Sequence, residues 1–190
     1  MARNVRIDFD REFNFTEISK DFRIGVFPTE LVDGTIVPLK VEIHNEEMEL
    51  LPNVFNLAFG PIDAKGGIDD RIQLTHKDYS AVFSTIMFEA LGYLRDNPDH
   101  FIGVDGSNNE RAALYHFLLK RNYDYLDPLF EFFGIKYYVR ITRFGKTQYE
   151  NPFDFQDIMP APVRILKDDP RPNPMFNYFI FGLRNQDQAR

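Results

Sequence analysis

The segment FIGVDGSNNERAALYHFLLKR, residues 101–121, decides the fold. Its first five residues, 101–105, form a short apolar run between two helical patterns, which is typical of a buried strand that pairs in parallel with a neighbour. Gly106 permits a sharp turn, and a helix is expected to begin at Ser107. The apolar side of that helix comprises Ala112, Leu114, Tyr115, Leu118 and Leu119. A buried strand that leads directly into a helix predicts a sheet with helices packed on it.

Strands are expected before this segment. Residues 21–47 read as strands around a turn, and Val37, Leu39, Val41 and Ile43 alternate in them, with Pro38 favouring an edge position. Residues 53–60 read as a further strand, followed by a loop over 63–70 and a short strand at 71–74. In residues 5–9 the apolar side chains alternate, which indicates an edge strand or an ordered arm.

A long helix is expected from Thr75 to about Arg95, capped by Thr75 with Asp78 reaching back, and ended by Asn97-Pro98. Its wide apolar face indicates packing against the sheet. That face carries Val82, Phe83, Ile86, Met87, Ala90, Leu91 and Leu94.

After the second helix, residues 126–134 read as a short helix closed by Gly134, and residues 135–143 as a strand with a hairpin partner. A Pro-rich spacer at 167–174 precedes the apolar segment MFNYFIFGL, residues 175–183. Together these patterns predict a single α+β domain, with a mixed, twisted β-sheet and packed helices over residues 1–160. Residues 161–190 form the spacer and a C-terminal segment that packs on the domain or on a partner.

The composition narrows the class of protein. The chain has 190 residues, a formal net charge of −7 and no cysteine, so a generic nucleic-acid binder is not expected and thiolate or disulfide chemistry is excluded. No apolar run is long enough to span a membrane, and a cytoplasmic location is expected. The four histidines lack metal-ligand spacing, and the acidic loop with Asp63, Asp69 and Asp70 does not match a calcium-loop pattern, so no metal site is predicted.

The junction at residues 105–115 has two interpretations. Ser107 and Glu110 have the spacing of a capping box, which needs no ligand. The same geometry places a helix N-terminus at the carboxyl end of a strand, where anions bind, although Asp105 and Glu110 add opposing charge. The candidate ligand-binding residues are Ser107, Asn108, Asn109, Arg111 and Tyr115. No catalytic residue is assigned.

Two resemblances involve this junction. The segment G-S-N-N-E-R-A-A-L-Y resembles a G-S-x-x-x-R-x-x-L-Y segment in an uncharacterised family of small bacterial proteins, over about residues 53–143. Gly106, Ser107, Arg111, Leu114 and Tyr115 match it, while Ala113 stands where a second arginine is expected. This resemblance implies no known activity.

The second resemblance is to the GNAT acyltransferases. The chain is similar in its order of elements and, through Asn109, Ala112 and a displaced Tyr115, in an N-x-x-A-x-x-x-Y helix. The family's Q/R-x-x-G-x-G/A loop, which cradles the coenzyme A pyrophosphate, is absent, because LTHKDYSAVFSTI contains no glycine. The similarity therefore implies shared architecture more than shared chemistry.

Two functions remain open from the sequence. The first is a non-catalytic interaction protein of bacterial or phage origin, in a defence, counter-defence or toxin–antitoxin system. It would have a protein partner or form a homo-oligomer, and it would need no cofactor. The alternative is an enzyme of GNAT-like fold that binds an acyl-CoA or a nucleotide at residues 105–115.

Overall fold

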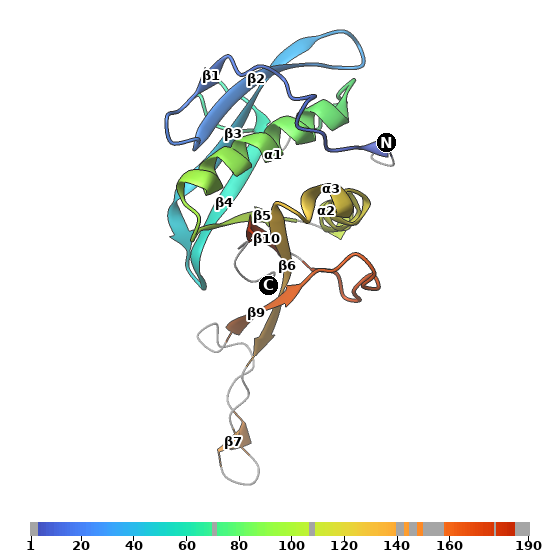
Figure 1. The fold of residues 1–190 in the computed structure, drawn as a ribbon. Coiled ribbons are helices and arrows are strands. Elements are labelled where there is room, and N and C mark those ends of the chain that lie inside the picture. Colours follow the sequence, from blue (N-terminus) through green and yellow to red (C-terminus); the bar gives the residue numbers. More distant parts are fainter. Residues whose placement is uncertain are drawn as a thin grey trace.

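Within the described part of the chain, eight strands form one mixed sheet with helices packed on it (Figure 1). The computed structural model describes residues 4–69, 72–106, 109–139, 143–144, 148–149, 158–176 and 178–184. None of the described helices is long and apolar enough to cross a membrane. This architecture is the single-domain α+β fold that the sequence predicts.

The elements follow one another along the chain as strands, a long helix, a strand, two helices and further strands. They are β1 (Glu17–Ile18), β2 (Ile24–Glu30), β3 (Ile36–Met48), β4 (Leu51–Pro61), α1 (Tyr79–Asp96), β5 (Phe101–Asp105), α2 (Asn109–Arg121), α3 (Tyr123–Leu126), β6 (Phe130–Val139), β7 (Arg143–Phe144), β8 (Gln148–Tyr149), β9 (Ile158–Arg164) and β10 (Tyr178–Leu183). The order in the large sheet is β1-β2-β3-β4-β5-β10-β6-β9, and β7 and β8 form a separate pair.

The pair of β4 and β5 is parallel, as predicted for residues 101–105, and the other strand pairs described in this sheet are antiparallel. The parallel pairing is short. It joins Val54 to Phe101, Phe55 to Ile102 and Asn56 to Gly103, although β4 continues to Pro61 and β5 to Asp105. Beyond Asn56 and Gly103 the two strands are therefore no longer paired with each other.

The C-terminal strand β10 lies inside the sheet, between β5 and β6, and is antiparallel to both. It belongs to the apolar segment 175–183, so this segment is an internal strand of its own chain's sheet. The domain boundary expected at residue 160 falls within β9.

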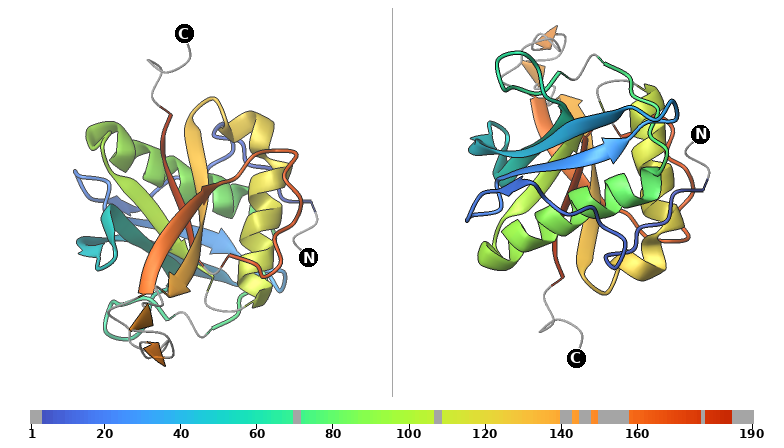
Figure 2. Two further views of the ribbon diagram at one scale, coloured as in Figure 1. Left: turned by 90° about the horizontal axis from the view of Figure 1, so that it is seen from below. Right: turned by 90° about the horizontal axis from the view of Figure 1, so that it is seen from above.

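Helices α1 and α2 contribute to one core on one face of the sheet (Figure 2). From α1, the predicted apolar residues Val82, Ile86, Ala90 and Leu94 are buried there. Phe179 and Phe181 of β10 join this core, while Tyr178 and Ile180 belong to a second cluster with Leu51, Val54 and Ile135. The alternation along β10 thus places apolar side chains on both faces, as expected for an internal strand.

Residues 5–13 form an ordered arm, which was one of the two structures predicted for this segment. The arm runs beside α1 (Figure 2, right) and is bound by side chains of that helix. Ser80 and Ser84 accept hydrogen bonds from the backbone N–H groups of Arg6 and Asp8, each at 2.9 Å, and Thr85 accepts one from Phe13 at 2.8 Å.

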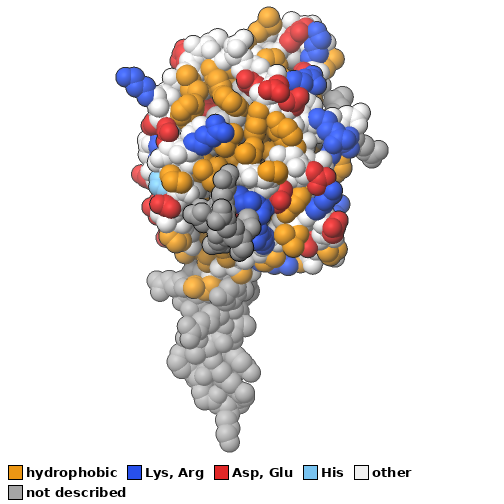
Figure 3. Space-filling model, viewed as in Figure 1, with side chains coloured by type: hydrophobic (Ala, Val, Ile, Leu, Met, Phe, Trp, Pro, Cys, Tyr) orange, Lys and Arg blue, Asp and Glu red, His pale blue; other side chains and the backbone are white. Residues whose placement is uncertain are grey.

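Hydrophobic side chains gather across the middle of the face seen in Figure 3, with charged side chains around them.

Two predicted elements were wrong. The helix expected over residues 126–134 is a turn followed by the start of β6, and only Tyr123–Leu126 is helical there. Phenylalanine favours strands, and Phe130 and Phe132 alternate into the core, so tertiary packing outweighs the helical reading. The strand expected at 71–74 is also absent among its described residues, 72–74, because this stretch has no partner strand.

The cap of the long helix was also assigned to the wrong residue. The helix begins at Tyr79 and its N-cap is Asp78, whose carboxylate accepts a hydrogen bond from the Ala81 N–H at 3.0 Å. Thr75 lies too far upstream for this role.

Pro38 was expected on an edge strand, but β3 is internal. Its position tolerates proline because the pairing with β4 ends at Leu39.

Glu89 on α1 is fully buried, and no described residue forms a hydrogen bond with either of its carboxyl oxygens. It packs so close to Gly25 of β2 that a Cβ atom at that position would lie 2.4 Å from Oε2. Burial raises the pKa of Glu89 from its ordinary value of 4.5 to about 8. The side chain is therefore protonated in the folded protein at neutral pH.

Phe181→Ala should lower the free energy of unfolding by about 3–5 kcal/mol, because the side chain is buried in the internal strand and packs edge-on against Phe130. Urea denaturation measures this loss. Val163→Ala, at a side chain of β9 that is 39% exposed, is the control and should cost well under the Phe181 value. A loss below about 1 kcal/mol at Phe181 would contradict its place in the core.

Glu89→Gln should change how stability depends on pH. A carboxyl with a raised pKa in the folded state makes its full contribution to stability below pH 4.5, and this contribution decreases as the pH rises towards about 8. The wild-type free energy of unfolding should therefore fall, relative to that of Glu89→Gln, by about 1.4 kcal/mol per pH unit within this window. Urea denaturation at pH 5, 6.5 and 8 measures the difference, with the exposed Glu49→Gln as control. A difference that stays constant with pH would refute a protonated Glu89.

Candidate functional site

A cleft opens where β4 and β5 part. A cavity of about 460 Å³ lies there. Its walls come from residues 56–61 of β4, Val104 and Asp105 of β5, the first turns of α1, the N-terminal half of α2 and the loop before α1. Ligands of sheets with parallel strands bind at the carboxyl ends of those strands, and the cleft lies at the carboxyl ends of β4 and β5.

The polar side chains of the cleft include Asp105, Arg111, Tyr115 and His76. Asp105 is exposed at the end of β5, and no described residue forms a hydrogen bond with its carboxylate. Arg111 and Tyr115 lie one turn apart on α2, so both point to the same side of the helix. His76 lies in the loop before α1, with Nδ1 3.2 Å from the Thr29 hydroxyl.

The environment of these groups sets their protonation. Burial raises the pKa of the Tyr115 hydroxyl, while nearby Arg111 lowers it and Asp105 raises it. Burial lowers the pKa of His76. Tyr115 is therefore a hydroxyl donor at neutral pH, and His76 is neutral. Among the described lining residues, the charged side chains are two carboxylates, Asp69 and Asp105, and one guanidinium, Arg111.

A smaller apolar chamber of about 70 Å³ adjoins the cleft. The two cavities share five wall residues, which are Leu57, Phe59, Phe83, Val104 and Tyr115. The chamber is otherwise enclosed by Ile7 of the arm, Ile86 and Met87 of α1, Leu118 and Leu119 of α2, Leu126 of α3, and Phe179 and Phe181 of β10. Within the described residues, its walls are thus hydrophobic on every side.

The structure brings together part of the site predicted from the sequence. Arg111 and Tyr115 line the cleft. Ser107, Asn108 and the side chain of Asn109 lie outside the described residues, so the capping box and their role in binding stay predictions. His76 was not selected, and Asp105 was considered only as an unfavourable charge. Its place at the end of a parallel strand was the signal that could have identified it.

The N-terminus of α1, where an acyltransferase would hold a pyrophosphate, carries a carboxylate. Asp78 caps the helix, and Arg11 forms a 3.1 Å ion pair with it. An anion at this position would meet the negative charge of Asp78 and would compete with it for the first amides of the helix.

No group of three potential metal ligands occurs among the described residues. In the acidic loop, the Asp63 carboxylate accepts hydrogen bonds from the N–H groups of Lys65 at 2.7 Å and Gly67 at 2.8 Å. Asp63 therefore stabilises the turn itself, and Asp70 lies outside the described residues.

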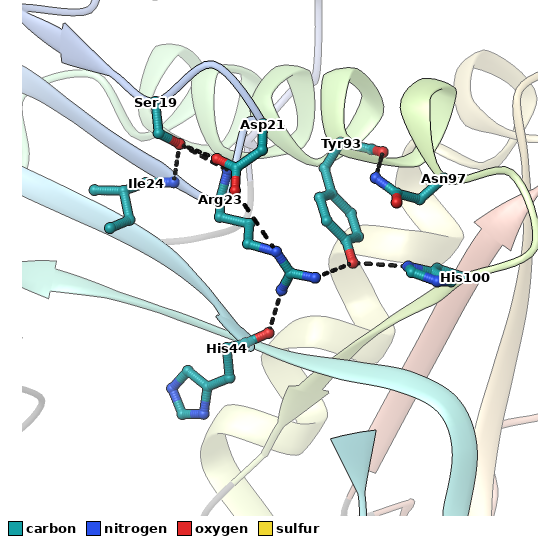
Figure 4. A network of polar contacts seen from close by, with 8 residues as sticks. All are labelled: Ser19, Asp21, Arg23, Ile24, His44, Tyr93, Asn97 and His100. Atoms are coloured by element: carbon teal, nitrogen blue, oxygen red, sulfur yellow. Dashed lines mark hydrogen bonds and ion pairs between the residues drawn. The ribbon is translucent and has the colours of Figure 1, made fainter. Parts of the chain in front are cut away.

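A second polar cluster, at the other end of α1, holds the fold together (Figure 4). Arg23 donates hydrogen bonds to the Tyr93 hydroxyl at 2.9 Å and to the backbone carbonyl of His44, and its guanidinium lies over the rings of Phe55 and Tyr93. The Tyr93 hydroxyl is 2.8 Å from Nδ1 of His100. Because arginine can only donate, the hydroxyl oxygen accepts the hydrogen bond from Arg23. This chain joins the segment before β2, β3, α1 and the loop before β5.

Comparison with known proteins identifies one family. The model of a family of unknown function, DUF6934, matches residues 13–156. No curated protein and no solved structure matches the chain. The match agrees with the uncharacterised family expected from the sequence, but it shows neither the G-S-x-x-x-R-x-x-L-Y motif nor the acyltransferase similarity.

Tyr93→Phe should lower the free energy of unfolding by about 1–3 kcal/mol, because it leaves Arg23 and His100 without their shared hydroxyl partner in a largely buried site. Thermal and urea denaturation measure the loss. Tyr137→Phe, at a side chain that is 46% exposed, is the control. Equal stability of the two variants would show that the cluster contributes nothing to the fold.

Proposed function

Since the chain belongs to the DUF6934 family, whose function is unknown, we propose its function from its own cleft: the protein binds a small molecule in the opening between β4 and β5, and Asp105 recognises it. The observation that carries this proposal is the exposed carboxylate of Asp105, without a hydrogen-bond partner among the described residues, at the mouth of a cavity of about 460 Å³. A concave site with apolar walls and a few convergent polar groups is typical of small-molecule binding.

The charges of the cleft select the ligand. Asp105 is an exposed carboxylate in its wall, and His76 is neutral. A ligand that places a cationic group at Asp105 gains a charge-assisted hydrogen bond, whereas an anion is repelled. The Tyr115 hydroxyl then faces the less basic part of the same ligand as a donor.

The acyltransferase resemblance supports the location but not the cofactor. The order of strands, helix, strand, helix and strands is the order on which that resemblance rests. The site at residues 105–115 coincides in part with the cleft through Asp105, Arg111, Leu114 and Tyr115. Asp78 at the N-terminus of α1 opposes a pyrophosphate, so we propose a ligand without one and no acyl-CoA or nucleotide cofactor.

If the site is catalytic, Tyr115 is the group to act as a proton donor. Burial keeps its hydroxyl protonated, and it lies on the wall that both cavities share.

A second candidate is the interaction role, in a bacterial or phage defence, counter-defence or toxin–antitoxin system in the cytoplasm. Exposed apolar side chains on one face of β9 favour it, namely Met159 and Val163. Strand β9 ends the sheet, and its Pro160 and Pro162 have no N–H groups. A protein partner would therefore dock on these side chains rather than add a strand.

Asp105→Asn should weaken the binding of small primary amines by about 10–100-fold, because a charge-assisted hydrogen bond is replaced by a neutral one. Ligand-observed NMR with a panel of amines and matched carboxylates measures binding to the full chain. Asp96→Asn, an exposed carboxylate at the other end of α1, is the control and should bind as the wild type does.

Acetyl-CoA in the same buffer should leave the melting temperature unchanged, because the pyrophosphate finds no free helix N-terminus at α1. Tighter binding of the carboxylates than of the amines, or equal binding by Asp105→Asn and the wild type, would overturn the proposal.

A further inference from the structure

We propose that the ligand is amphipathic: its cationic head lies at Asp105, and a short hydrocarbon tail enters the apolar chamber that adjoins the cleft. This inference rests on the proposed function, since it concerns the same ligand. It assigns to the chamber a role in selecting the tail.

The chamber is suited to a tail rather than to water. Its described walls are hydrophobic, so a water molecule inside would lack the hydrogen-bond partners that it needs. Protein surfaces and cores pack closely, and the chamber, at about 70 Å³, has room for more than a single water molecule. A hydrocarbon group that fills it gains dispersion contacts with its hydrophobic walls.

The walls also connect the chamber to the cleft. Val104 and Tyr115 line both cavities. Asp105, whose side chain alternates to the other face of β5 from Val104, interacts electrostatically with Tyr115, Tyr137 and Tyr178 at the end of the strand. A ligand bound at Asp105 reaches the chamber past the wall that Val104 and Tyr115 share. Phe83 of α1 completes this shared wall from the opposite helix.

The arrangement predicts a preference for tail length. Each methylene that enters an apolar site contributes about 0.8 kcal/mol, which corresponds to about fourfold in Kd. The affinity should rise with length only until the chamber is filled, and further methylenes should add nothing.

The test measures the Kd values of straight-chain primary amines from propylamine to octylamine for the full chain by ligand-observed NMR. For the wild type, Kd should fall about fourfold per methylene and then reach a plateau. Leu119→Phe, which fills part of the chamber from α2, should reach the plateau at a shorter chain than the wild type does. Met87→Phe, from the α1 wall, is the second variant if Leu119→Phe does not fold.

The control is Phe117→Leu, which lies on the same helix but lines neither cavity. It should reproduce the wild-type series. If Kd does not depend on chain length, or if the wild type and the filled variants reach the same plateau, the tail does not enter the chamber and this inference is wrong. The proposed function is unaffected by either result. If no amine binds, or if matched carboxylates bind more tightly, the proposed function fails as well.

Discussion

The position of β10 between β5 and β6 is the constraint on which the rest of the structure depends. Strands β1–β5 and strands β6 and β9 are not otherwise paired with each other in the described sheet, so β10 makes them one sheet. Its paired residues run from Tyr178 to Gly182 along β5 and from Tyr178 to Leu183 along β6. Its side chains enter a core on each face, which is why the most apolar stretch near the C-terminus belongs inside.

The cleft follows from this arrangement. Strand β5 stays paired with β10 as far as Asp105, and β4 stays paired with β3 as far as Pro61, so each keeps a partner on its outer side when the two part. The divergence begins at a defined point. The Tyr178 side chain crosses Gly103, where a Cβ would collide with its hydroxyl, and donates a hydrogen bond to Asn56 at 3.2 Å. This hydrogen bond connects β10 to β4 across β5, at the last residue pair of β4 and β5. The cleft opens immediately beyond that pair.

The sequence predicted the parts of this architecture that depend on local pattern. The periodicity of α1 and the apolar run of β5 between two helices were sufficient for their type and for the parallel pairing. The position of β10 in the sheet could not be predicted from the sequence, because an apolar strand pattern does not specify which strands it pairs with. The helix predicted over residues 126–134 was wrong for a related reason. That prediction used only neighbouring residues, whereas Phe130 and Phe132 are held in a strand by pairing with β10, which is distant in the sequence.

The candidate site was predicted in the same uneven way. Arg111 and Tyr115 were found because they follow a predicted strand-to-helix junction, whose geometry can be read from sequence. Asp105 was counted against a ligand, since the junction was considered as an anion site. The cleft combines Asp105 and Asp69 with residues of α1 and of the loop before it, which no local pattern could bring together.

Architecture and chemistry can thus diverge at two helix N-termini. A helix N-terminus attracts anions through its free amides and its dipole, but a carboxylate beside it satisfies the same amides and cancels the same field. In this chain Asp78 does so at α1, and Asp105 precedes α2 at the end of β5. Among the described residues, the start of α1 therefore carries a carboxylate where an anion would bind, and Asp105 adds a second carboxylate in the cleft. Similar orders of strands and helices can therefore carry different chemistry.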